Sequence, residues 1–170
     1  MTKKAVLISI RPKWCELIAN GEKTVEIRKT LPKLKTPFKC YIYCTQQKHP
    51  YDDFISFVAE DGVIGFFGGR KVIGEFVCDD IRYADAFNFI VKEDGEKALE
   101  GSCIDKADLF EYLGWENGMP RAECTPFYRW HISDLKIYGT QKKLSEFALK
   151  RPPQSWCYVE ELEGDDHAQE

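Results

Sequence analysis

The sequence predicts an α+β fold in which a small mixed β-barrel is flanked by a few short helices. Three observations indicate it. Strand-length apolar or alternating runs recur along the 170 residues, whereas helix-like stretches are few and short. The two longest strand-like runs cover 71–83 and 127–138. The first of them contains Gly74, which is typical of a bend in a barrel strand.

Composition indicates one globular domain. Hydrophobic residues make up 44% of the chain and aromatic residues 14%. There are no repeats and no linker, so we expect a single domain over 1–161 and a disordered acidic tail over 162–170. There is no apolar run of membrane-spanning length, and the six-residue strand after Lys4 is too short for a signal-peptide core. We therefore expect a cytoplasmic protein without membrane association.

The cysteines predict neither a metal site nor a disulfide framework. Seven cysteines in a chain without an export signal favour reduced, mostly buried thiols. Cys40 and Cys44 share one face of a predicted strand, but they would lie about 13 Å apart, too far to bind one metal ion. We therefore expect no metal and no cofactor.

The first fifty residues predict a strand, a short helix and two further strands. Residues 5–10 form an apolar run, and Pro12 suits the first turn of a helix. Residues 14, 17 and 18 then give one apolar stripe, which Asn20-Gly21 ends. Residues 24–28 alternate, so Glu26 and Arg28 project from one face of a strand. Residues 29–37 predict a loop, and 39–45 another strand.

The remaining elements are predicted from shorter signals. Asp52-Asp53 suits the first turn of a short helix through residue 58, and 62–69 predicts a glycine-rich turn that lacks the Lys-Ser/Thr of a phosphate-binding loop. After the strand at 71–83, residues 87–91 suggest a further strand. Residues 105–113 predict a helix that Gly114 ends. Residues 144–149 predict a short element, and Pro152-Pro153 an extended turn into a strand at 156–159.

Charge is unevenly distributed along the chain. The net charge is −4, but residues 1–50 carry 11 Lys/Arg and 3 Asp/Glu, a balance of +8. Residues 51–120 carry 6 and 16, a balance of −10, and residues 121–151 carry 7 and 3, a balance of +4. If the two basic segments meet in space, one face would favour an anionic partner such as RNA. The alternative is an ordinary solvated surface.

Two motifs carry a resemblance to a known family. Ser9-Ile10-Arg11-Pro12, followed by Gly21-Glu22-Lys23-x-x-Glu26-x-Arg28, resembles the signature of ASCH domains, relatives of the RNA-binding PUA domain. The similarity extends over most of 4–161, through Gly74-Glu75-Phe76, 128–132 and 151–156. It implies a PUA-like pseudobarrel that binds RNA or a nucleotide in a cleft beside the first helix. It also implies a possible activity, because some members hydrolyse N4-acetylcytidine and others are associated with nuclease activity.

The motif supplies most of the candidate ligand-binding residues. Arg28 can fork to a phosphate or base edge, Lys23 offers a compact charge, and Glu26 can accept a hydrogen bond from an exocyclic amine. The alternative is an ion pair on a wet sheet face. Aromatic side chains offer either stacking faces or core packing. The full candidate set is Arg11, Lys13, Trp14, Lys23, Glu26, Arg28, Glu75, Tyr128 and Trp156.

Catalysis is a separate hypothesis. The hydrolase branch, as the resemblance implies, uses the motif lysine, a threonine nucleophile and a distant glutamate. Lys23 matches the lysine, but Glu26 occupies the nucleophile position. Thr24 is the nearest threonine, and Glu75 is the candidate for the distant glutamate.

Three functions therefore stay open. The leading one is an RNA- or nucleotide-binding domain. The alternatives are a small hydrolase using Lys23, Glu26 and Thr24, and a protein-interaction module using the acidic segment 51–120. His131 and Cys157 suit either structural or functional roles.

Overall fold

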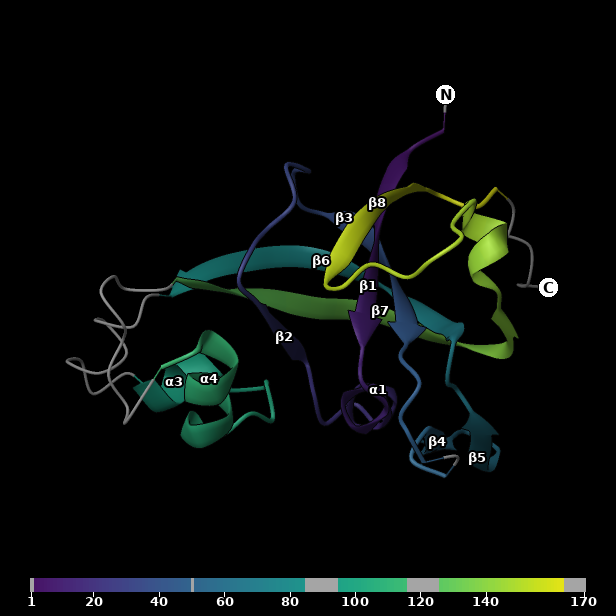
Figure 1. Cartoon of the computed structure of the whole chain (residues 1–170), viewed down its shortest axis with the longest axis horizontal. Helices are drawn as coiled ribbons and strands as arrows, with labels where there is room; N and C mark the ends of the chain where they lie inside the picture. Colours follow the sequence, from purple (N-terminus) through teal and green to yellow (C-terminus); the bar gives the residue numbers. More distant parts are fainter. Residues whose placement is uncertain (1, 50, 85–94, 116–125, 164–170) are drawn as a thin grey trace.

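A six-stranded mixed sheet forms the body of the molecule. The computed structural model describes residues 2–49, 51–84, 95–115 and 126–163. In the sheet, the strand order is β2-β7-β6-β3-β1-β8, with β1 and β3 parallel and all other neighbours antiparallel. The strands are β1 (Lys4–Ile10), β2 (Val25–Arg28), β3 (Phe38–Cys44), β6 (Lys71–Ala84), β7 (Phe127–Lys142) and β8 (Trp156–Glu160). In Figure 1 the long β6–β7 ribbon runs across the molecule and β1 crosses it.

Short helices complete the α+β fold. They are α1 (Pro12–Ala19), α3 (Gly95–Leu99), α4 (Lys106–Leu113) and the 3₁₀ helix η1 (Leu144–Phe147). α1 begins at the proline and ends before Gly21, whose φ of 74° suits glycine. The Asp105 side chain accepts from the Asp108 N–H at the start of α4. None of the helices in the described segments is long and apolar enough to cross a bilayer.

The sheet is not closed by backbone pairing, which refines the expected barrel. Within the described residues, β2 and β8 are the two edges and no strand ladder joins them. Side chains connect this side of the molecule instead. Arg28 Nη2 donates to the Ser9 carbonyl (2.7 Å), Trp156 Nε1 donates to Thr30 Oγ1 (2.9 Å), and the Lys33 N–H donates to the Tyr158 hydroxyl (2.7 Å). The result is an open sheet whose gap is bridged by side chains.

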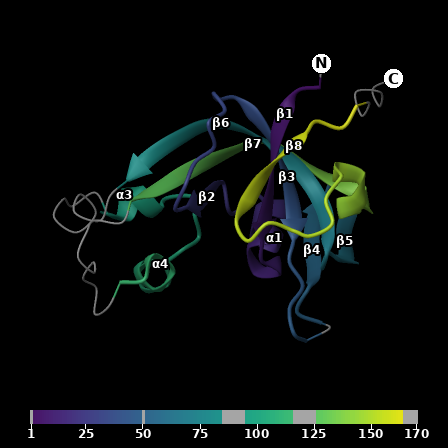
Figure 2. The same cartoon turned by 45° about the horizontal axis from the view of Figure 1, so that its top comes forward.

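Two predictions for residues 52–69 were wrong. Instead of a short helix and a glycine-rich turn, this region forms a hairpin of β4 (Phe54–Ala59) and β5 (Gly62–Phe67). Glu60-Asp61 makes its tight turn, and Gly62 has a φ of 124°. Aromatic and β-branched residues alternate between the two faces of the hairpin, and this period outweighs the helix-start signal of Asp52-Asp53. Figures 1 and 2 place the hairpin at one end of the molecule and α3 and α4 at the other, with α1 between them.

Smaller differences concern element ends. β7 continues to Lys142, four residues beyond the predicted end of that strand, and α3 had not been predicted. The strand suggested at 87–91 lies outside the described residues, as does the predicted tail from residue 164 onward. The first residues of that tail are placed, and the Leu162 N–H donates to the Tyr41 hydroxyl (3.0 Å).

The core lies on both faces of the sheet. The largest cluster joins α1 to β1, β3, β6 and β7, and includes Ile18, Phe38, Phe76 and Trp130. A second cluster lies under η1 and β8, and a third packs α4 against β2 and β7. α1 and α4 are therefore fixed by buried contacts at two borders of the region described next.

Candidate functional site

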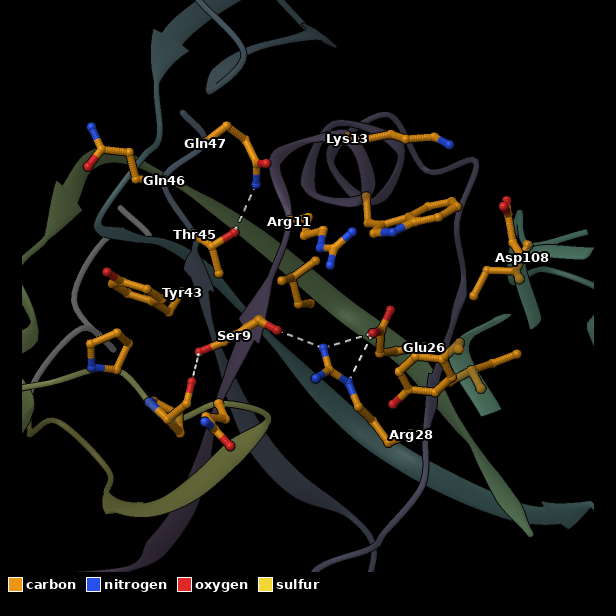
Figure 3. A pocket seen from close by; sticks show the side chains of 18 of the residues that line it. Ser9, Arg11, Lys13, Glu26, Arg28, Tyr43, Thr45, Gln46, Gln47 and Asp108 are labelled. Atoms are coloured by element: carbon orange, nitrogen blue, oxygen red, sulfur yellow. Dashed lines mark hydrogen bonds and ion pairs between the residues drawn. The ribbon is translucent and has the colours of Figure 1, made fainter. Parts of the chain in front are cut away.

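A cleft of about 1010 Å³ opens where five parts of the chain meet. These parts are the β1–α1 junction, β2, the segment following β3, α4 and the turn at 152–154. Figure 3 shows the Arg11 side chain near the middle of the cleft, with the Glu26–Arg28 pair beside it. The Ser9 hydroxyl donates to the Pro153 carbonyl (2.7 Å) and so ties the turn to β1.

A buried chain of charges forms the floor. Glu26 Oε1 lies 2.9 Å from Arg28 Nη2 and accepts from Arg28 Nε at 3.0 Å. Glu26 Oε2 lies 3.3 Å from Lys23 Nζ, which donates to the Ser102 carbonyl. All three side chains are less than 10% exposed. Alternation on β2 explains the Glu26–Arg28 pair, while the turn at Gly21 brings Lys23 beneath it.

The donors of Arg28 are directed at the protein. Besides Glu26, the guanidinium reaches the Ser9 carbonyl through Nη2 (2.7 Å) and the Ser155 hydroxyl through Nη1 (3.2 Å). A guanidinium has five N–H donors in a rigid fork, and here that fork joins β2, β1 and the turn before β8. Arg28 therefore fixes the shape of the floor.

Basic side chains around the cleft are, in contrast, accessible. Arg11, Lys13, Lys48 and Arg70 are all exposed and line the cleft. Within the described part of the chain, the side chains of Arg11, Lys48 and Arg70 form no hydrogen bond or ion pair. Lys13 Nζ lies 4.5 Å from the centroid of the Trp14 ring.

The opposite rim is acidic and aromatic. α4 contributes Asp108, Glu111 and Tyr112, and β3 contributes Tyr43. Burial raises the pKa of both phenols, and for Tyr43 the Arg70 charge partly opposes that effect. Both phenols therefore keep their protons at neutral pH and can donate hydrogen bonds.

Five of the nine predicted ligand-binding residues line the cleft: Arg11, Lys13, Trp14, Glu26 and Arg28. Lys23 lies behind the floor, with its side chain fully buried. Of the three residues considered for hydrolysis, Glu26 alone lines the cleft, since Thr24 is exposed outside it. This placement gives no support to a Lys23–Thr24 catalytic pair.

The other three predicted ligand-binding residues lie elsewhere. Glu75 pairs with Lys39 (3.2 Å) and accepts from the Tyr138 hydroxyl. Tyr128 packs edge-on against Tyr83, with ring centroids 5.8 Å apart. Trp156 packs 6.0 Å from the Trp130 ring. These contacts are those of structural side chains.

The two residues left open by the sequence have ordinary partners. His131 Nδ1 lies 2.6 Å from Asp79 Oδ1 on the β6–β7 ribbon, and this hydrogen bond lowers the pKa of Asp79. Cys157 is half-buried, and its burial raises the pKa of the thiol. Neither residue lines the cleft.

Sequence reasoning missed Tyr43, Lys48, Arg70 and the α4 residues of the cleft. Lys48 directly follows a correctly predicted strand, so its place near the end of β3 was available as a signal. Arg70 was hidden by the incorrect prediction for residues 62–69. The position of α4 depends on tertiary packing, for which the local sequence carries no signal.

Comparison with known proteins identifies a shared domain. The sequence model of the ASCH domain matches residues 8–118. The crystal structure of ASCH from Zymomonas mobilis has 19% identity and a TM-score of 0.60, covering 91% of this chain and 86% of that one. Two point mutants of the same protein give 18% identity, coverages of 92% and 90% and a TM-score of 0.60, and 16%, 91%, 87% and 0.62. At such identities the likeness shows the fold alone. No curated protein sequence matches the chain.

Proposed function

Because this chain belongs to the ASCH domain family, a PUA-like fold often associated with RNA binding, we propose that its cleft binds single-stranded RNA or a nucleotide. One observation carries the proposal. Four exposed cations surround the cleft, and three of them have no side-chain partner in the described residues. Unpaired cations at the border of a cavity suit phosphate groups.

The charge balance of the cleft supports an anionic ligand. Its lining includes five basic residues and three acidic ones, a balance of +2. The buried carboxylate of Glu26 is already paired with Arg28 and Lys23, so it adds little negative potential. Asp108 and Glu111 lie together on α4, which leaves the positive potential near Arg11, Lys48 and Arg70.

The size and lining suit a nucleotide. A volume of about 1010 Å³ is at the upper end of the range for small-molecule sites, about 300–1,000 Å³. Trp14 and Tyr112 supply aromatic rings from two different helices, on which a base can stack. In this proposal the exposed cations contact phosphates, while Glu26 and Arg28 hold the floor in shape.

The test is salt-dependent binding of a fluorescently labelled single-stranded RNA, followed by anisotropy. If all four cations contact phosphates, the slope of log K against log salt should be about −3, since each contact contributes about −0.7. Arg11→Gln, Lys48→Gln and Arg70→Gln should each weaken binding and reduce the slope by about 0.7.

Lys136→Gln is the matched control. Lys136 is exposed and does not line the cleft, so its substitution changes the net charge equally without removing a proposed contact. Binding that is insensitive to salt, or cleft variants that bind like Lys136→Gln, would contradict the proposal.

A further inference from the structure

The β4–β5 hairpin has one protected edge and one open edge. On the β4 side, α1 takes the place of a neighbouring strand. Glu16 Oε1 accepts from the Ser56 N–H (2.9 Å), and Asn20 Nδ2 donates to the Ser56 carbonyl (3.0 Å). Asn20 Oδ1 also accepts from the Val58 N–H (3.2 Å). The backbone groups on this edge of β4 are therefore satisfied by side chains.

β5 lacks such protection. The Gly68 N–H donates to the Asp53 carbonyl, which fixes the alternation of the ladder. By that alternation, the backbone groups of Val63, Gly65 and Phe67 point away from β4. Within the described segments, no strand pairs with this edge, and its one recorded contact is a long hydrogen bond from Lys71 Nζ to the Phe67 carbonyl (3.4 Å). Figure 1 shows β5 on the side of the hairpin away from α1.

The outer face of the hairpin is apolar and exposed. Val58 and Val63, which pair across the strands, are 73% and 76% exposed. Phe54 and Phe67 form the other cross-strand pair and are 46% and 49% exposed. Unpaired backbone groups beside an exposed apolar face are the features of a strand that accepts another strand.

We propose that β5 pairs antiparallel with β5 of a second copy of this chain, centred on Gly65. This register places Gly65 opposite its own copy and Val63 opposite Phe67 of the second copy. It is the register that uses all three outward-pointing residues in both chains. Two hairpins then form one four-stranded sheet in the order β4-β5-β5-β4.

Charge complementarity favours a second copy as the occupant. The turn of the hairpin carries Glu60 and Asp61, and the chain leaving β5 carries Arg70 and Lys71. All four residues are exposed. In the antiparallel register the acidic turn of each copy lies beside the basic exit segment of the other. The edge is thus complementary to itself in backbone groups, in apolar contacts and in charge.

The expected dimer is weak, because a pair of six-residue strands buries less than a standard interface of about 1,600 Å². Sedimentation velocity from about 1 to 500 µM should show the 19.7-kDa chain shifting toward twice that mass. Val63→Lys places a charge at the seam and should raise the dissociation constant at least about tenfold.

Val58→Lys is the matched control. Val58 lies on the same face with nearly equal exposure, but on β4, one strand away from the seam. It should leave the dissociation constant within about twofold of wild type. A chain that stays monomeric at every concentration would overturn the proposal. Equal weakening by both substitutions would also overturn it, because stacking of the two outer faces would then be the contact.

A cross-link tests the register. Gly65→Cys should form a disulfide-linked dimer under mild oxidation, since residues directly opposite in a ladder have Cα atoms about 5.5 Å apart. The new side chain displaces only the end of the half-exposed Phe54 ring. Val63→Cys is the control, because the two copies of residue 63 would lie about 13 Å apart. Equal cross-linking of both variants would contradict a register centred on Gly65.

Discussion

At the scale of single residues, Glu26 links the fold to the cleft. One carboxylate oxygen holds Arg28, which in turn reaches β1 and the turn before β8. The other oxygen faces Lys23, whose ammonium group is fully buried and has the Ser102 carbonyl as its hydrogen-bond acceptor. Because burying a charge is unfavourable without a partner, these three residues depend on one another.

Glu26→Gln should therefore destabilise the protein strongly. The substitution preserves the shape of the side chain but leaves Lys23 buried without its counter-charge. Removing one partner of a buried pair typically lowers the free energy of unfolding by about 3–5 kcal/mol. Urea denaturation followed by circular dichroism measures the change.

Asp80→Asn provides the comparison. It removes an ion pair of similar length, 2.9 Å, between side chains that are 73% and 50% exposed. Its effect should be about 0–1 kcal/mol. Adding Lys23→Met to Glu26→Gln should recover part of the lost stability, since it removes the unpaired charge. Equal effects of Glu26→Gln and Asp80→Asn would show that the floor contributes no more than a surface pair.

At the scale of elements, α1 serves two neighbours. Its first turn places Arg11, Lys13 and Trp14 at the cleft. One and two turns later, Glu16 and Asn20 hold the edge of β4. Ile18 packs into the core between these sets. The eight-residue helix therefore couples the position of the hairpin to that of the cleft.

Glu16→Ala should loosen the hairpin while leaving the main sheet intact. The substitution removes the acceptor for both the Ser56 N–H and the Ser56 hydroxyl, each at 2.9 Å. Hydrogen bonds to charged groups contribute about 1.5–3 kcal/mol, so amides in 54–67 should exchange with deuterium faster. Mass-spectrometric hydrogen exchange locates the effect, and peptides from β6 and β7 should keep wild-type rates.

Glu22→Ala is the control for this substitution. Glu22 is exposed, and its side chain has no recorded partner among the described residues. Faster exchange in the hairpin of both variants would mean that the net charge, and not the Glu16 contact, holds the hairpin in place.

Most elements of the main sheet were predictable because their signals are local. Pro12 and Gly21 bound α1, Asp105 and Gly114 bound α4, and the alternation at 24–28 gives β2. The hairpin was not predictable in the same way. Asp52-Asp53 resembles a helix start, and the glycines of β5 resemble a loop, so only pairing between the two strands reveals the period of two.

At the scale of the whole molecule, the cleft was only partly predictable. The family motif identifies its floor and the first turn of α1. The other lining residues arrive from three further segments through tertiary packing. The two edges of the sheet likewise meet through side chains of Arg28 and Trp156, for which no periodicity in the sequence gives a signal.

Buried thiols provide a measure of how the whole molecule opens. Cys15, Cys40 and Cys78 lie in the main core on α1, β3 and β6. Burial raises the pKa of all three, and that of Cys78 to about 12. Because the thiolate is the reactive form, these residues should resist iodoacetamide at pH 8. Cys103 is exposed and should react first, with peptide mass spectrometry identifying each site.

The concentration of urea should then separate two classes of thiol. Cys103 should react at a similar rate across the native range, whereas the three core thiols should react together as the sheet unfolds. Cys103→Ser should abolish the fast phase and leave the slow one unchanged. If Cys15 reacted well before Cys40 and Cys78, α1 would be separating from a still folded sheet, and the cleft and the hairpin would lose their common support at that step.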